Sequence, residues 1–253
     1  ISMKKIVVCN HKMLLTYDEA YNYEKKLEDI DLSNIKLIIC PSYINLNLFN
    51  KFNLGAQDVF YEDKGSYTGE ISAYFLSLVG VRYSIIGHFE RRKYDSNEII
   101  NKKIKSALKN SITPIVCIGE SKTDKELMRT SYVIKKQIKE YFDGIKLGRD
   151  DELIIAYEPG WAIGNGKSLY KDEILDTFKF IRKTLEMYGI DKYKLLYGGS
   201  VCSKTIKNIL SDDIDGYLVG ASSADASELE KIIKSIKKYK LNDNSPIYLF
   251  PFC

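Results

Sequence analysis

Short apolar runs alternate with helical patterns along almost the whole chain, and this alternation is the feature that most restricts its fold. Eight runs are predicted to be strands, at 5–10, 36–40, 55–58, 83–86, 113–118, 153–157, 194–197 and 216–219. These runs are apolar throughout, which is typical of a parallel sheet covered by helices. Eight strand–helix units in one chain of 253 residues predict an α/β fold, a single closed (β/α)8 TIM barrel, rather than a doubly wound sheet.

Capping residues mark where several helices begin. Thr16 with Glu19 forms a capping box, and Asp95 with Glu98 is expected to cap a helix that runs to about Asn110. No composition break marks a second domain, so the barrel is expected to span residues 1–239. The remaining residues, 240–253, are predicted to be a C-terminal tail, to which the sequence assigns no role.

Charge and cysteine usage exclude several classes of function. The net charge is only +4, and no basic stripe with interleaved aromatic residues is present, so no nucleic-acid partner is expected. No apolar run approaches the ~18 residues of a membrane span. Five widely spaced Cys with only two His argue against a disulfide framework or a metal site. A reducing, cytoplasmic location is therefore expected.

The segment Ala156–Gly166 (AYEPGWAIGNG) begins within the sixth predicted strand, and the carboxylate of Glu158 directly follows that strand. An ionised carboxylate is costly away from water, so Glu158 has the character of a catalytic base beneath a mobile loop. It is equally compatible with a solvated Glu in an ordinary strand-to-helix loop. This segment alone does not separate the two interpretations.

Polar and small residues follow several other strands, at the barrel end where chemistry collects. Asn10 and Lys12 follow the first strand, and His88 follows the fourth. Gly198-Gly199-Ser200 and Gly220-Ala221-Ser222 follow the last two strands, where exposed backbone N–H groups before helical segments suit a phosphate. Taken singly, a Gly-rich end is often a tight turn, a lone His is often structural and a Lys is often a surface charge. Taken together, these groups favour proton abstraction beside the carbonyl of a phosphorylated substrate.

The chain also resembles the triosephosphate isomerase family, on motifs that occur in that family's order and spacing over roughly residues 4–239. The motifs are Asn10-His11-Lys12-Met13, Ile86–Arg92 (IGHFERR), Ala156–Gly164 (AYEPGWAIG), Tyr197–Val201 (YGGSV) and Asp215–Gly220 (DGYLVG), with Thr68-Gly69-Glu70 and Cys117–Glu120 (CIGE) in support.

The resemblance implies an isomerase of glycolysis and gluconeogenesis that interconverts dihydroxyacetone phosphate and D-glyceraldehyde 3-phosphate through an enediolate. Glu158 would be the base and His88 the neutral electrophile. Lys12, paired with Glu90, would offset substrate charge, and Asn10 would help to hold the oxygens.

For substrate binding, the resemblance implies phosphate contacts from Gly164, Ser200, Gly220 and Ala221, and a lid over 159–167. It implies no metal and no organic cofactor. A homodimer is implied through the loop at 58–69, in which Tyr67 and Thr68 match the tip.

Four residues depart from the family pattern: His11 stands in place of Trp, Phe89 in place of Ser, Gly160 in place of a bulkier residue and Ala221 in place of Gly. Gly160 is expected to loosen the lid hinge by up to about 1 kcal/mol. Ala221 retains its N–H and so retains phosphate binding if its φ is not positive. Two alternatives stay open: an isomerase of a four-carbon ketose phosphate and a non-catalytic phosphate-ligand binder.

Overall fold

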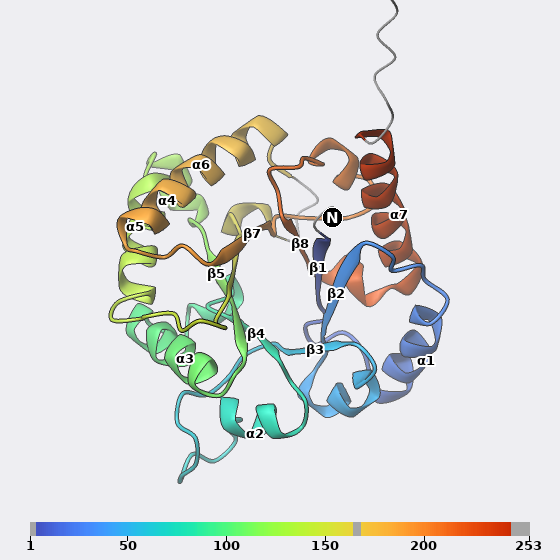
Figure 1. The fold of residues 1–253 in the computed structure, drawn as a ribbon, viewed down its shortest axis with the longest axis horizontal. Helices are drawn as coiled ribbons and strands as arrows, with labels where there is room; N and C mark the ends of the chain where they lie inside the picture. Colours follow the sequence, from blue (N-terminus) through green and yellow to red (C-terminus); the bar gives the residue numbers. More distant parts are fainter. Residues whose placement is uncertain (1–3, 164–167, 244–253) are drawn as a thin grey trace, which may run out of the picture.

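Eight parallel strands close into one barrel in the computed structural model, which describes residues 4–163 and 168–243 (Figure 1). Each strand pairs with the next in sequence order, and β8 pairs with β1 from Gly216 beside Ile6 to Val219 beside Cys9. The strands are β1 Lys5–Asn10, β2 Ile35–Cys40, β3 Asn53–Ala56, β4 Tyr83–Ile86, β5 Thr113–Ile118, β6 Leu153–Tyr157, β7 Tyr193–Tyr197 and β8 Gly216–Val219. The predicted (β/α)8 barrel is confirmed.

The α-helices form a ring around the barrel, as Figure 1 shows. They are α1 Tyr17–Leu27, α2 Ala73–Leu78, α3 Asn97–Lys109, α4 Lys122–Glu126, α5 Thr130–Tyr141, α6 Lys171–Met187 and α7 Ala226–Asp243. Five short 3₁₀ helices lie in the connections: η1 Tyr43–Phe49, η2 Phe89–Arg91, η3 Gly160–Ala162, η4 Ile206–Asn208 and η5 Ala221–Ala224. No helix of the described residues is long and apolar enough to cross a membrane.

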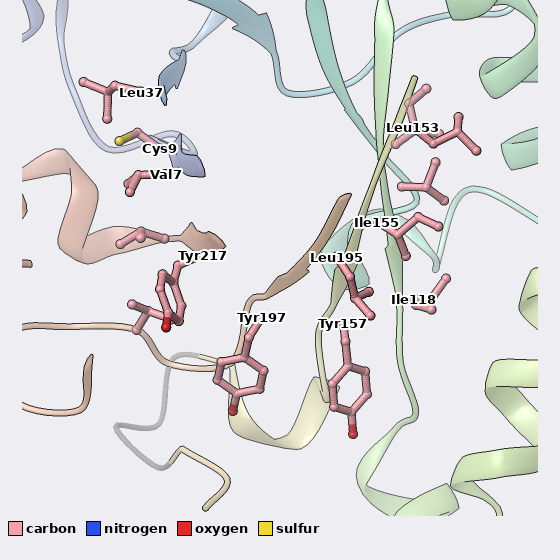
Figure 2. Close-up of a cluster of buried hydrophobic side chains, with 14 of the residues drawn as sticks. Val7, Cys9, Leu37, Ile118, Leu153, Ile155, Tyr157, Leu195, Tyr197 and Tyr217 are labelled. Carbon is pink, nitrogen blue, oxygen red and sulfur yellow. The ribbon is translucent and has the colours of Figure 1, made fainter. Parts of the chain in front are cut away.

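Two apolar layers result because successive strand residues point to opposite faces. In β1, Ile6 and Val8 face the barrel interior, whereas Val7 and Cys9 face the helices. Figure 2 shows part of the outer layer, with Tyr157, Tyr197 and Tyr217 contributed by β6, β7 and β8. The strands are thus buried on both faces, which explains why their sequences read as continuous apolar runs.

Two local predictions were wrong. The cap of α3 is Ser96, whose hydroxyl accepts from the N–H of Ile99 at 3.3 Å. Asp95 is instead buried and accepts from Nζ of Lys103 at 2.7 Å, because a buried ammonium group needs a counter-charge. The third strand lies two residues earlier than predicted, at Asn53–Ala56, and Asp58 binds the same Lys103 at 2.8 Å.

The last helix ends later than the sequence pattern predicted. Helix α7 continues to Asp243, a few residues beyond the point where its apolar pattern stops. Residues 244–253, the larger part of the predicted tail, lie outside the described residues.

Candidate active site

Four polar side chains from three strand ends line one cavity of about 270 Å³ at the carboxyl end of the barrel. They are Asn10, Lys12, His88 and Glu158, the four groups that the sequence nominated for catalysis. Ser200, Gly220 and Ala221 line the same cavity. The barrel brings these residues together because the ends of all eight parallel strands meet on one rim.

Glu158 is the most enclosed carboxylate of the cavity, since the residue is only 1% exposed. Its Oε1 lies 3.3 Å from Nε2 of His88, while its Oε2 has no hydrogen-bond partner among the described residues. Gly198 makes room for this side chain, because a Cβ at residue 198 would lie 2.9 Å from Cγ of Glu158. Oε2 is itself buried, and Oε1 is the oxygen that faces the imidazole of His88.

Electrostatics keep Glu158 ionised in this pocket. Burial by itself raises the pKa of Glu158, but the facing His88 and the nearby Arg92 outweigh burial and hold this pKa below its ordinary value. A base must be unprotonated at the working pH. Glu158 meets that requirement near neutrality.

His88 is held at both ring nitrogens. The backbone N–H of Glu90, in the short helix η2 that begins after His88, donates to Nδ1 at 3.2 Å. An acceptor Nδ1 leaves the proton of a neutral imidazole on Nε2, directed at Glu158. Burial lowers the pKa of His88, whereas the Glu158 carboxylate raises it and prevails. A doubly protonated ring would lose the hydrogen bond that the backbone N–H of Glu90 donates to Nδ1. The Glu158 carboxylate therefore favours the protonated ring, whereas the hydrogen bond from Glu90 favours the neutral ring.

Lys12 supplies the positive charge of the cavity. Its Nζ lies 2.6 Å from Oε1 of Glu90, the pairing that the sequence resemblance implied. Lys12 has φ 50°, and its backbone N–H is held by Oδ1 of Asn10 at 3.1 Å. Asn10 thus fixes the turn that directs Lys12 inward, in addition to lining the cavity itself.

The wall of the cavity between β6 and β1 is formed by the ends of β7 and β8. Helix η5 begins at Ala221, and Ala221 is not among the described residues with positive φ. Its backbone therefore meets the condition set for retaining phosphate binding. The hydroxyl of Ser200 donates to the carbonyl of Ala162, which ties this wall to the segment after β6. Gly164, the fourth expected phosphate contact, and the lid residues 164–167 lie outside the described residues.

Several groups that received no role from the sequence support the site. The guanidinium of Arg92 donates to the carbonyl oxygens of Gly87, Cys117 and Gly119 and so joins the ends of β4 and β5. Glu120 is fully buried and accepts from the indole N–H of Trp161 at 2.9 Å and from the hydroxyl of Tyr157. Both residues stand inside the quoted motifs, but all of these partners except Gly87 belong to segments of other strands, so only the fold identifies them.

His11 does not join the site although it stands between Asn10 and Lys12. It is 1% exposed, and neither ring nitrogen has a hydrogen-bond partner among the described residues. Its ring packs edge-on against Tyr23 and Phe49, with centroids 4.7 and 5.6 Å away. Burial lowers the pKa of His11 to about 4, so the residue is a neutral part of the core.

In the parts of the chain that the structure describes, no three His, Cys, Asp or Glu side chains are grouped so that they could hold a metal ion. The chemistry available to the described site is that of a base, an imidazole, a cation and backbone donors.

Comparison with known proteins finds one family throughout. A model of the triosephosphate isomerase family matches residues 5–236. The triosephosphate isomerase of Thermoanaerobacter pseudethanolicus is 39% identical over 244 residues, which cover 91% of this chain and 98% of that protein. The triosephosphate isomerase of Moorella thermoacetica is 38% identical over 243 residues, again with 91% and 98% covered. That of Dictyoglomus thermophilum is 40% identical over 249 residues, with 92% and 99% covered.

Proposed function

The chain belongs to the triosephosphate isomerase family, and on this premise we propose how its own residues carry out the reaction. The activity is the interconversion of dihydroxyacetone phosphate and D-glyceraldehyde 3-phosphate. The observation that carries the assignment of roles is the facing pair of Glu158 and His88, 3.3 Å apart in a cavity that also holds Lys12. A purely binding protein would have no use for an ionised buried carboxylate beside an imidazole.

Glu158 is the base in this proposal. Its carboxylate removes a proton from the carbon next to the carbonyl. The electron pair of that C–H bond forms the enediolate double bond, and the electron pair of the carbonyl double bond moves to its oxygen. The hydroxyl proton passes to the former carbonyl oxygen, and the protonated carboxylate returns its proton to the neighbouring carbon, so that the carbonyl is formed on the other oxygen. Burial supports this role, because a nearly dry carboxylate has little water to displace before it accepts a proton.

His88 and Lys12 stabilise the oxygens during this transfer. The Nε2–H of His88 faces Glu158, so a substrate that enters between them receives this hydrogen bond on its carbonyl or hydroxyl oxygen. Entry of the substrate also separates the imidazole from the carboxylate that raises its pKa, which favours the neutral ring. Lys12 and Asn10, on the β1 side of the cavity, offset the developing negative charge.

The phosphate is bound at the ends of β7 and β8. Ser200, Gly220 and Ala221 line the cavity, and η5 begins there at Ala221 with backbone N–H groups that can bind a phosphate. Gly164 remains part of this proposal on the family resemblance alone. Among the described residues that line the cavity, none favours the four-carbon ketose phosphate over the triose phosphates.

A coupled assay in both directions tests this function. Purified protein is expected to interconvert the two triose phosphates, and a phosphoglycolate-type inhibitor is expected to compete with either substrate. Absence of turnover with both substrates would overturn the assignment. Faster turnover of a four-carbon ketose phosphate than of the triose phosphates would transfer the same roles to that substrate.

We further propose that the chain forms a homodimer. The connection between β3 and α2 projects from the barrel in Figure 1, and its residues Tyr67 and Thr68 are exposed. Large apolar side chains are exposed on the loops after β1 and β2 and on α2: Met13, Leu14, Ile44, Phe75 and Leu78. Large exposed apolar side chains on segments that follow the neighbouring strands β1, β2 and β3 support an interface there. In a dimer, the projecting loop of one copy would lie beside Asn10 and Lys12 of the other.

Two matched variants test the dimer. Met13→Asp places a charge on the proposed interface, where Met13 is 94% exposed, whereas Met128→Asp places the same charge on the surface after α4, where Met128 is 92% exposed. Sedimentation is expected to give a monomer for Met13→Asp and a dimer for Met128→Asp. Equal sedimentation of the two variants would contradict the proposed interface.

A further inference from the structure

Two residues that depart from the family pattern, Phe89 and Gly160, contact each other beside the catalytic pair. Phe89 directly follows His88, and Gly160 lies two residues after Glu158. They belong to η2 and η3, the short helices that follow β4 and β6. Any contact between them therefore links the segment that carries the imidazole to the segment that carries the base.

The ring of Phe89 occupies the space of a side chain at residue 160. A Cβ added to Gly160 would lie 2.3, 2.5 and 2.7 Å from the Cε2, Cδ2 and Cζ atoms of this ring. Gly160 is not among the described glycines with positive φ, so its backbone conformation is open to any L-residue. It is the Phe89 ring, and not the backbone, that requires glycine here.

Both partners are held in place by other contacts. Phe89 is half-buried, and the guanidinium of Arg92 lies 5.9 Å from its ring centroid while that guanidinium binds carbonyl oxygens at the ends of β4 and β5. The N–H of Gly160 donates to the carbonyl of Glu120 at 2.8 Å. The contact thus lies between two anchored segments.

We propose that Phe89 is a positioning residue for Glu158. The ring of Phe89, which follows β4, supplies the packing that a bulkier side chain at residue 160 would supply from the hinge itself. This proposal rests on the catalytic role proposed above for Glu158. The ring limits the conformational freedom that glycine gives to the hinge and holds the start of η3 at its distance from His88. Phe89 and Gly160 are then a coupled pair: the effect of replacing one of them depends on which residue stands at the other position.

A double-mutant cycle tests the coupling. Gly160→Val alone is expected to lower kcat about tenfold or more with a smaller change in KM, because Val displaces the Phe89 ring. Phe89→Ser alone is expected to lower kcat severalfold, because it leaves the glycine hinge without packing. In the Phe89→Ser background, Gly160→Val is expected to raise kcat. Effects of Gly160→Val that agree within twofold in the two backgrounds would overturn the proposal.

Trp161 gives a second measurement that does not depend on turnover. It is the only Trp of the chain and directly follows Gly160, so its fluorescence reports on the hinge. Acrylamide quenching of Trp161 is expected to increase in Phe89→Ser and to return toward the wild-type value in the double variant. Phe180→Ser, at a half-buried Phe on α6, serves as a control that is expected to leave quenching and kcat unchanged.

The two measurements separate failure of this proposal from failure of the catalytic assignment. If the wild-type protein turned over neither triose phosphate, the role of Glu158 would fail, and the quenching cycle would still decide whether Phe89 and Gly160 are coupled. If the protein is active and neither kcat nor quenching shows coupling, the pair is not a positioning device.

Discussion

His88 lies between a backbone donor and a carboxylate: its Nδ1 accepts from the N–H of Glu90 at 3.2 Å, and its Nε2 lies 3.3 Å from Oε1 of Glu158. The first contact fixes which nitrogen carries the proton of the neutral ring, and the second directs that proton at the carboxylate of Glu158. A short helix that begins directly after a strand end therefore sets both the tautomer and the aim of the imidazole. The following predictions depend on this geometry and on the packing that supports it.

Shortening the side chain of Glu158 by one methylene group distinguishes a role in proton transfer from a role in substrate binding. Glu158→Asp is expected to lower kcat about 100-fold or more with a much smaller change in KM, because the carboxylate retracts by about 1 Å from the carbon that it deprotonates. Steady-state kinetics in both directions measure this. Glu24→Asp, at a buried Glu on α1 away from the cavity, is the control and is expected to keep the wild-type kcat. An unchanged kcat in Glu158→Asp would remove Glu158 from the role of base.

The backbone N–H of Ala221 is expected to bind the phosphate. Ala221→Pro removes this donor at the first position of η5, where Pro is otherwise tolerated. Loss of a hydrogen bond to a charged group costs about 1.5–3 kcal/mol, so KM is expected to rise about 10- to 100-fold, and the Kd of a phosphoglycolate-type inhibitor is expected to rise in parallel. Ala221→Gly keeps the N–H and is expected to stay within about threefold of wild type. Equal KM values for the Pro and Gly variants would contradict the contact.

Buried His11 is expected to make stability fall at acid pH. Its pKa is about 4 in the folded protein against an ordinary value of 6.5, so between these two pH values the unfolded chain binds a proton that the folded chain does not. Stability is therefore complete above the ordinary pKa and is lost as pH falls toward 4, by on the order of 3 kcal/mol from this residue. Urea unfolding of wild type and His11→Phe at several pH values measures the effect. The two proteins are expected to diverge in the unfolding midpoint as pH falls from 7 to 4.5, and parallel curves would show that His11 is protonated in the folded state.

Barrel closure is expected to depend on Gly216. A Cβ at this position would lie 2.0 Å from the backbone oxygen of Ile6 and 2.7 Å from its carbonyl carbon, and a backbone neighbour cannot move aside as a side chain can. Gly216→Ala is expected to destabilise the protein by about 3 kcal/mol or to prevent folding. Gly148→Ala is the control, since a Cβ there would meet only the side chain of Asp151 within 4 Å. Thermal unfolding compares the two, and equal melting temperatures would contradict the prediction.

The sequence by itself determined the elements, their order and the chemical groups of the site. Strand identity is local information, because a run such as Leu153–Tyr157 that is buried on both faces must be apolar throughout. The position of Glu158, His88 and Lys12 at strand ends followed from the same runs. Since all parallel strands of a barrel end on one rim, counting strands was enough to predict that these groups share a cavity.

Only the tertiary structure decided the partners of several other groups. The partner of Asp95 is Lys103 and not the helix that it precedes, because the charge balance of a buried cluster outweighs a local capping signal. His11 faces the core between Tyr23 and Phe49, although its sequence neighbours line the cavity. Phe89 meets Gly160 because β4 and β6 both flank β5, so residues 71 positions apart in sequence lie against each other. Such contacts depend on the volume left between packed segments, and that volume exists only once the barrel has closed.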